Sequence, residues 1–255
     1  IDTGKKIIHI KKEKAIEKAV SEGKTLIQHK SKASIENIDE FVKKRKISKV
    51  YNDMILIQDL VDKKFRSSRN DTNNRQDTNF TNMSGYLLEV VKDDNGLVEI
   101  DLCNSQIAIS TLVIDLDTDD FRNYKELALN CQMYEYLQEH LNLSTRTEAK
   151  IVMFEVFFSS HKFRGSSVTK MRKLFPTVMD WIDTYKMERG DNQFAILLQK
   201  KESEIFIDNL YERLKHEYLV FNKHDSMICR AESEKEVREI IKTYFDEIGF
   251  EVMIR

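Results

Sequence analysis

Helical spacing of apolar residues dominates the pattern along this chain. Apolar side chains recur every three or four positions, which places them on one face of a helix, and polar residues occupy the other face. This spacing predicts helices with polar connections over most of 12–66, and further helices over 119–140, 193–216 and 234–248. The chain is therefore expected to be mostly helical.

Strands are predicted at four places that lie far apart in the sequence. Residues 97–102, LVEIDL, alternate like a half-buried strand, and FEVMIR ends the chain as another. Between them, residues 218–222 and 226–229 predict the two arms of a hairpin. Scattered strands among long helices indicate an α+β fold in which distant segments build one small sheet.

Local signals place the start of two more helices. Thr145 and Glu148 form the T-x-x-E pattern of a capping box, so a helix begins there and runs through the sequence KIVMFEVFF. Pro176, the only proline, opens the helix PTVMDWIDTYK, because proline is favoured in the first turn of a helix. Residues 67–82 are rich in Asn, Asp and Thr, which predicts a loop or an extended segment.

The composition is typical of a soluble, helix-rich globular protein. Of 255 residues, 41% are hydrophobic and 33% are charged, and the longest apolar runs are too short to span a membrane. Cys103, Cys131 and Cys229 lie far apart, which favours reduced thiols in a cytoplasmic compartment over a disulfide framework. The sequence contains neither CxxC nor HExxH, which argues against a zinc site.

The net charge of −2 conceals an asymmetry between two parts of the chain. Residues 1–75 hold 19 Lys and Arg against 11 Asp and Glu, a net charge of +8, whereas the remainder carries −10. The basic residues cluster in KKIIHIKKEK, KKRK and KKFRSSR. Such clusters are usually a solvated face, and a phosphate-binding surface is the alternative.

Two aspartates stand where predicted strands end. Asp101 ends the strand LVEID, and Asp225 follows His224 at the tip of the hairpin FNKHDSMIC. Each aspartate alone is typical of a turn, because Asp side chains bond to nearby backbone groups. On neighbouring strands, however, the two carboxylates could share two divalent cations, an arrangement that suits phosphoryl transfer.

A stripe of cations and aromatic rings follows the helix that starts after Thr145. Arg146, Lys150, Phe154 and Phe158 are spaced by four, so they lie along one side of the helix. Cations near a helix N-terminus oppose the helix dipole, and a polyanionic partner would explain their presence. The alternative is an ordinary amphipathic helix with its Phe rings in the core and its cations in water.

The order of these segments resembles motifs A, B and C of the family A nucleic-acid polymerases. A strand with Asp101, a helix with R-x3-K-x3-F-x3-F from Arg146, and the strand–His–Asp–strand hairpin follow one another as in that family. The single-subunit RNA polymerases share much of this layout. NRQDTNFTNM resembles the Arg-led segment before motif A, and FAILLQKKESEIFI resembles the helix that carries a Gln before motif C. The similarity covers about residues 65–255, and the chain is most similar to short, divergent phage or mobile-element members.

The resemblance implies roles for the residues of the three motifs. Asp101 and Asp225, with the backbone at Leu102, would hold two Mg²⁺ ions, for which Mn²⁺ can substitute. Arg146 and Lys150 would grip the triphosphate of the incoming nucleotide, and Lys150 would protonate the departing pyrophosphate. These are implied catalytic and metal-binding roles and do not follow from the spacing alone.

The remaining implied contacts concern the base, the sugar and the nucleic acid. Phe154 would stack on the incoming base or sugar, and Phe158 would lie near the templating base, where tyrosine is usual. Arg75 and Gln199 would touch the minor groove of the primer–template, and His224 would brace the primer end.

Departures from the family pattern bear on the choice of sugar. Gln106, five residues after Asp101, matches the position that blocks a ribose 2′-OH, which favours DNA synthesis. Ser226 follows the His-Asp pair, as in single-subunit RNA polymerases, which favours RNA synthesis. The glycines expected after the motif B aromatics are replaced by Glu155 and Ser159.

The resemblance also implies a domain layout of the right-hand polymerase type. The palm, with its small antiparallel sheet, would comprise 67–118 and 193–255, and helical fingers would comprise 119–192. Residues 1–66 would form a basic helical part, either a reduced thumb or a duplex contact.

The implied function is template-directed nucleotidyl transfer, in which a DNA polymerase adds dNTPs to a primer 3′-OH by a two-metal mechanism. The partners would be a DNA primer–template, dNTPs and further replication or mobile-element proteins, in a bacterial or phage-infected cytoplasm and without membrane contact. The alternatives are an RNA-synthesising primase or RNA polymerase, an inactive polymerase-like nucleic-acid-binding subunit, and a helical interaction protein.

Overall fold

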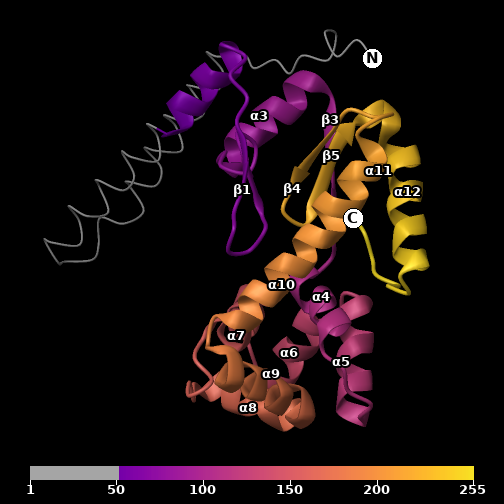
Figure 1. Ribbon diagram of the computed structural model, residues 1–255. Helices are drawn as coiled ribbons and strands as arrows, with labels where there is room; N and C mark the ends of the chain where they lie inside the picture. Colours follow the sequence, from indigo (N-terminus) through magenta and orange to yellow (C-terminus); the bar gives the residue numbers. More distant parts are fainter. Residues whose placement is uncertain (1–51) are drawn as a thin grey trace, which may run out of the picture.

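The computed structural model describes residues 52–255 and shows an α+β fold (Figure 1). Most of the predicted N-terminal helical part therefore lies outside the described residues, and the described piece of it is helical over 52–61. The strands are β1 (Ser67–Arg69), β2 (Gln76–Thr78), β3 (Leu97–Asp101), β4 (Val220–Lys223) and β5 (Ser226–Arg230). The main helices are α3 (Gly85–Asn95), α4 (Ser105–Val113), α5 (Asp119–Leu129), α6 (Met133–Leu141), α7 (Arg146–Phe158), α8 (Ser166–Leu174), α9 (Pro176–Arg189), α10 (Gln193–Ser203) and α12 (Glu234–Glu247).

A three-stranded antiparallel sheet forms the centre of one half of the molecule. Its strand order is β3-β5-β4, so the strand predicted at 97–102 pairs with the second arm of the predicted hairpin. The first arm is shifted toward the turn and occupies Val220–Lys223. The segment predicted as a loop or extended structure forms a second, two-stranded sheet of β1 and β2.

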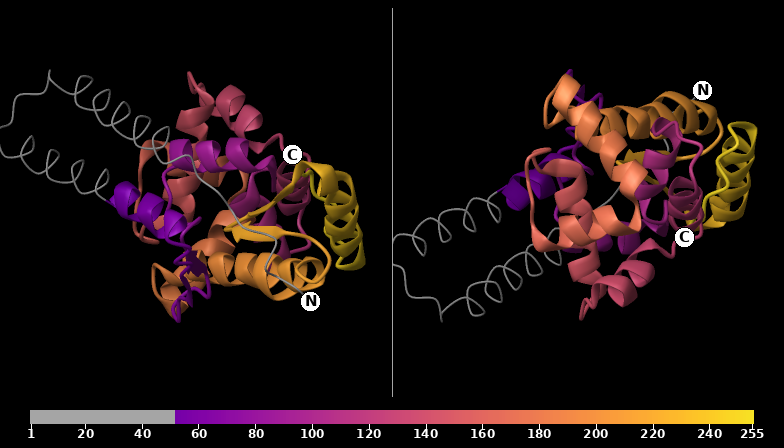
Figure 2. Two further views of the ribbon diagram at one scale, coloured as in Figure 1. Left: turned by 90° about the horizontal axis from the view of Figure 1, so that it is seen from above. Right: turned by 90° about the horizontal axis from the view of Figure 1, so that it is seen from below.

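Successive side chains of a strand point to opposite faces of the sheet, so this half of the molecule has a separate core on each face. Met227 and Cys229 of β5 face the main core with η2 (Glu204–Tyr211) and α12, whereas Ile228 faces a smaller core with α3. Seen from above, the strands lie between α3 on one side and the orange and yellow C-terminal helices on the other (Figure 2). Both faces of the sheet are therefore covered.

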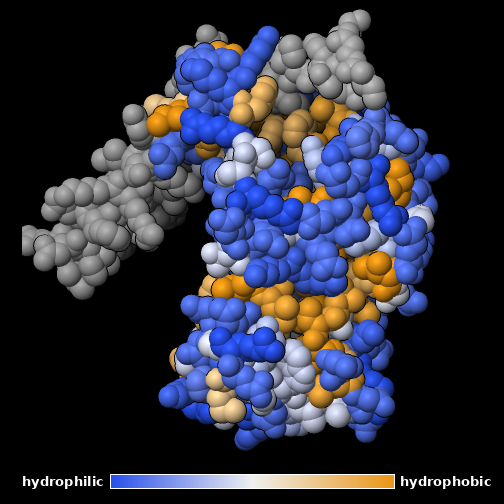
Figure 3. All heavy atoms as spheres, viewed as in Figure 1, coloured by the Kyte–Doolittle hydropathy of each residue, from blue (hydrophilic) through white to orange (hydrophobic). Residues whose placement is uncertain are grey.

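The other half of the molecule is a helical bundle of α5 to α9 (Figure 1). Large aromatic side chains fill its interior, and Tyr124, Phe157, Phe175 and Phe194 are fully buried. Helix α10 crosses from this bundle to the sheet, and its continuation through η2 and α11 (Glu212–Leu214) confirms the long helix predicted there. Apolar side chains gather at the waist beside α10 and α4, whereas the rest of the visible surface is mostly hydrophilic (Figure 3).

The structure refines the predicted elements at three points. The stretch predicted to be helical over 119–140 is helical, and it consists of two helices because Asn130 to Gln132 interrupt it and Cys131 has a positive φ of 61°. FEVMIR is not a regular strand: one bridge joins Ile254 to Leu102, and backbone hydrogen bonds join Arg255 to Asp101 and Met253 to Cys103. Helices α3, α4 and α8 had no counterpart in the sequence prediction.

The expectation of three reduced thiols is wrong, because a disulfide joins Cys103 to Cys131 and only Cys229 remains a free, buried thiol. Sequence separation could not reveal this pair, since folding brings together two cysteines that lie 28 positions apart. Among the described residues, no helix is both long enough and apolar enough to cross a membrane.

Candidate active site

The two motif aspartates come together at one end of the central sheet. Asp101 ends β3 and lies opposite Ser226, the first residue of β5, so Asp225 is the next residue along the turn. The backbone N–H of Leu102 donates to the carbonyl oxygen of Asp225 over 3.2 Å, which ties the two segments together. His224 has a positive φ of 55°, which gives the tight two-residue turn without a glycine.

The carboxylates of this pair repel one another. Partial burial, then the negative charges of Asp225 and Glu99, raise the pKa of Asp101 to about 6. Asp101 is exposed as a residue, so a cation from solvent can reach it. A divalent cation would relieve this repulsion, and carboxylate oxygens are the ligands that Mg²⁺ prefers.

Glu99 is a third acidic residue on the same face of β3, two positions before Asp101. Burial would raise the pKa of Glu99, but hydrogen bonds from Ser226 and Lys92 outweigh it, and the pKa is lowered. The Ser226 hydroxyl donates to Glu99 over 2.8 Å, and Lys223 pairs with the same carboxylate. Glu99 is therefore engaged by protein groups, which leaves Asp101 and Asp225 as the carboxylates available to a cation.

In the part of the chain that the structure describes, no three His, Cys, Asp or Glu side chains form a ready-made metal-binding cluster. The candidate site thus consists of two carboxylates and the adjoining backbone. The N–H of Leu102 is already engaged, and the part of its backbone in metal binding stays a prediction.

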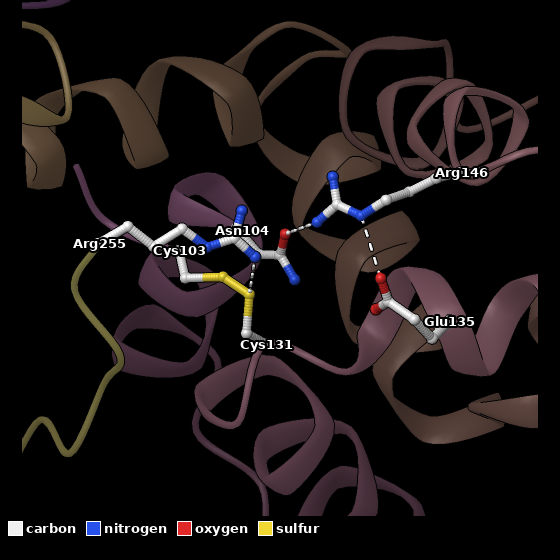
Figure 4. The surroundings of a disulfide bond; sticks show 6 residues. All are labelled: Cys103, Asn104, Cys131, Glu135, Arg146 and Arg255. Atoms are coloured by element: carbon white, nitrogen blue, oxygen red, sulfur yellow. Dashed lines mark hydrogen bonds and ion pairs between the residues drawn. A yellow bond between two sulfur atoms is a disulfide. The ribbon is translucent and has the colours of Figure 1, made fainter.

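Arg146 connects the helical bundle to Asn104, which lies between β3 and α4 (Figure 4). Helix α7 begins where predicted, because the Thr145 hydroxyl accepts the backbone N–H of Glu148 and caps it. From the first residue of this helix, the guanidinium donates to Asn104 Oδ1 and to Glu135 Oε1, over 3.1 Å each. Asn104 is three residues after Asp101, so this hydrogen bond ties Arg146 to the segment that follows the Asp101 strand.

The next residues of the stripe lie along the exposed side of α7. Lys150 is exposed, and its Nζ lies 5.9 Å from the centre of the Tyr134 ring. Phe154 is 62% exposed and stacks on Phe158 with 4.4 Å between ring centres. The alternative that places the Phe rings in the core does not hold for Phe154, because its ring is exposed. An exposed stacked ring offers a surface for another flat ring.

Arg75 and Gln106, predicted to serve different purposes, meet on one buried carboxylate. Glu202 of α10 is 1% exposed, and Arg75 donates to both of its oxygens over 2.9 Å each. The Nε2 of Gln106 donates to the same carboxylate. Burial raises the pKa of Glu202 despite the nearby Arg75, so the ion pair has to offset a real desolvation cost.

Gln199 and His224 lie around this ion pair. The side-chain oxygen of Gln199 accepts the amide of Asn73, and burial followed by the charge of Arg75 lowers the pKa of His224. The three predicted nucleic-acid contacts, Arg75, Gln199 and His224, therefore lie beside the aspartate turn. Their contact with a duplex stays a prediction, and Arg75 and Gln199 already have protein partners.

Three polar atoms of one short turn are buried without a partner. They are Asn104 Nδ2, Ser105 Oγ and Gln106 Oε1, at the start of α4 and directly after Asp101. Buried polar atoms are normally hydrogen-bonded, so an unsatisfied row beside two carboxylates is unusual and suits a polar ligand.

The disulfide lies next to this turn (Figure 4). Cys103 precedes Asn104, and Cys131 precedes α6, so the bond ties the aspartate strand to the helix that carries Glu135. At the chain end, the Arg255 guanidinium lies 3.1 Å from Cys131 Sγ, and its backbone pairs with that of Asp101.

Four residues of this site were not predicted from the sequence: Glu99, Asn104, Tyr134 and Glu202. Glu99 had a signal, because it shares a strand face with Asp101, and Glu202 lies one helical turn after Gln199. Asn104 and Tyr134 carry no local signal, because their role depends on contacts between distant segments.

Comparisons of the chain with models of protein families, with curated proteins and with solved structures found no match in any of the three.

Proposed function

We propose that this protein is a template-directed nucleotidyltransferase that adds dNTPs to the 3′-OH of a DNA primer. The observation that carries the proposal is the position of Asp101, which ends β3 opposite Ser226, next to Asp225 in the turn before β5. In this interpretation the sheet half is the palm and the α5–α9 bundle is the fingers.

Asp101 and Asp225 would hold two Mg²⁺ ions, which activate the primer hydroxyl and neutralise charge on the leaving phosphates. The repulsion that raises the pKa of Asp101 supports this assignment, because the pair has excess negative charge that a cation would balance. Mn²⁺ has the same ligand preference and is expected to substitute.

Arg146 and Lys150 would bind the triphosphate of the incoming nucleotide. Arg146 is held in place by Asn104 and Glu135, so little conformational entropy is lost when it engages an anion. Lys150 lies one turn further on, is exposed and points along the same side of the helix, where it would protonate the departing pyrophosphate. The exposed Phe154–Phe158 stack would receive the base.

RNA synthesis is the second candidate, and one observation favours it. The Nε2 of Gln106 is tied to Glu202, which leaves Oε1 as a buried acceptor without a partner. A ribose 2′-OH could donate to this oxygen. Gln106 would then accept a ribonucleotide, whereas the resemblance implies that its bulk blocks one.

Primer extension distinguishes the candidates. Wild-type protein would be incubated with a labelled primer–template, with Mg²⁺ or Mn²⁺, and with either dNTPs or NTPs. We expect extension with dNTPs and none after metal chelation. Extension with NTPs alone would support the RNA-synthesising alternative, and no extension with either would leave an inactive nucleic-acid-binding subunit.

A further inference from the structure

Tyr134 lies beside both cations of the α7 stripe. It is the second residue of α6, directly before Glu135, and its ring packs against the main core. The Arg146 guanidinium lies 4.6 Å from the ring centre, and Lys150 Nζ lies 5.9 Å from it. A cation within about 6 Å of an aromatic ring centre is attracted to the ring face.

The electrostatic interactions of Tyr134 also place it close to charged groups from two other segments. Burial raises the pKa of Tyr134, Arg146 opposes this, and the charges of Asp225 and Glu135 add to it. Tyr134 is thus within electrostatic reach of Arg146 on α7 and of Asp225 at the strand turn.

We propose that Tyr134 is a positioning residue whose ring holds Arg146 and Lys150 together as a polyphosphate-binding clamp. This inference rests on the proposed function, because the polyphosphate would be that of the incoming nucleotide. The aromatic ring is the active part: it offers a face to two like-charged groups that would otherwise repel each other one helical turn apart.

The test compares substitutions at Tyr134 with one at Tyr136. Tyr134→Leu removes the ring, and Tyr134→Phe restores it without the hydroxyl. Tyr136→Leu is the matched control, because Tyr136 lies on the same helix but stacks on His140 and lies close to Phe175. Thermal unfolding of each variant reports whether any loss is merely structural.

Two readouts are measured for each variant. The first is KM and kcat for single-nucleotide addition, and the second is the Kd of inorganic tripolyphosphate, by calorimetry without metal or nucleic acid. For Tyr134→Leu we expect KM and Kd to rise about tenfold, equivalent to about 1.4 kcal/mol, with kcat within about twofold of wild type. Tyr134→Phe should recover most of this loss, and Tyr136→Leu should leave both constants near wild type.

The other possible results either overturn the proposed clamp or separate it from the proposed function. Unchanged constants in Tyr134→Leu, equal losses in Tyr134→Phe, or equal losses in Tyr136→Leu would overturn it, as would a wild-type protein that does not bind tripolyphosphate. If the wild type extends no primer but binds tripolyphosphate in a ring-dependent way, the proposed function fails and the clamp stands. If the wild type extends primers and substitution of the ring has no effect, the clamp fails and the proposed function stands.

Discussion

At the scale of single residues, the site is a balance between paired and unpaired charges. Asp101 and Asp225 repel one another, and a bound cation would reduce this repulsion. Glu99 and Glu202 are instead already paired with basic groups. Carboxylates of the same site therefore have different roles. This difference leads to two measurable consequences.

The first concerns pH. The pKa of Asp101 is raised to about 6 in the absence of metal, so a proton competes with the cation below that pH. We expect the affinity for Mn²⁺ to rise about tenfold per pH unit up to about 6 and to level off above it. Calorimetric titration from pH 5 to 8 measures this, and an affinity independent of pH would contradict it.

The same shift has a consequence for stability. A raised pKa means that the contribution of Asp101 to stability is fully present at low pH and is lost as the pH rises through about 6. The Asp101→Asn variant should therefore have a slightly higher free energy of unfolding than wild type at pH 7.5 without metal, which means that it is slightly more stable. We expect a gain of less than about 1 kcal/mol, since solvent screens this exposed residue. Denaturant unfolding at pH 7.5 and 4.5 tests this, and a loss of stability at pH 7.5 would disprove it.

The second consequence concerns Arg75 and its matched control, Arg69. Arg75→Ala would leave Glu202 as an unpaired buried charge, which typically costs about 3 kcal/mol. Arg69→Ala breaks an exposed pair with Asp208, which is expected to cost less than about 1 kcal/mol. Denaturant unfolding of both variants gives the two values, and equal losses would show that burial of Glu202 is not what matters.

At the scale of elements, the sequence predicted those whose pattern is strong over their whole length. The strand with Asp101, the hairpin with Asp225 and the start of α7 were found because alternation and a Thr145 cap are local signals. Helix α8 was missed because it buries only two residues, Val168 and Met171, so its apolar face is too narrow to recognise. The C-terminal strand was overestimated, because only residues 253–255 pair with residues 101–103, and alternation cannot show how far a pairing extends.

The residues of the site also divide into those with a local sequence signal and those without one. Those that end a strand or begin a helix could be predicted, whereas contacts across long sequence separations could not. Glu202 meets Arg75 across 127 positions, and Asn104 meets Arg146 across 42. Only the fold brings these partners together, so no window of the sequence reveals them.

At the scale of the whole molecule, the disulfide links the sheet half to the helical half. The Cys103–Cys131 bond closes a loop over 28 positions, and such a loop contributes about 3–4 kcal/mol by restricting the unfolded chain. Addition of a reductant should lower the free energy of unfolding of the wild type by about that amount. A Cys103→Ser, Cys131→Ser double variant should not respond to reductant, and a wild type equally insensitive to it would contradict the bond.

The central claim is that Asp101 and Asp225 together form the centre of nucleotidyl transfer, and one measurement tests it most directly. Asp225→Asn keeps the shape of the turn but removes the charge that would hold the cations, and Asp208→Asn removes a surface charge paired with Arg69. Single-turnover addition of one nucleotide, with Mg²⁺, would be measured for both and for wild type. We predict a loss of roughly 10³-fold in Asp225→Asn, since metal ions contribute several kcal/mol, and a near-normal rate in Asp208→Asn. Addition by Asp225→Asn at the wild-type rate, with its fold intact, would contradict the account.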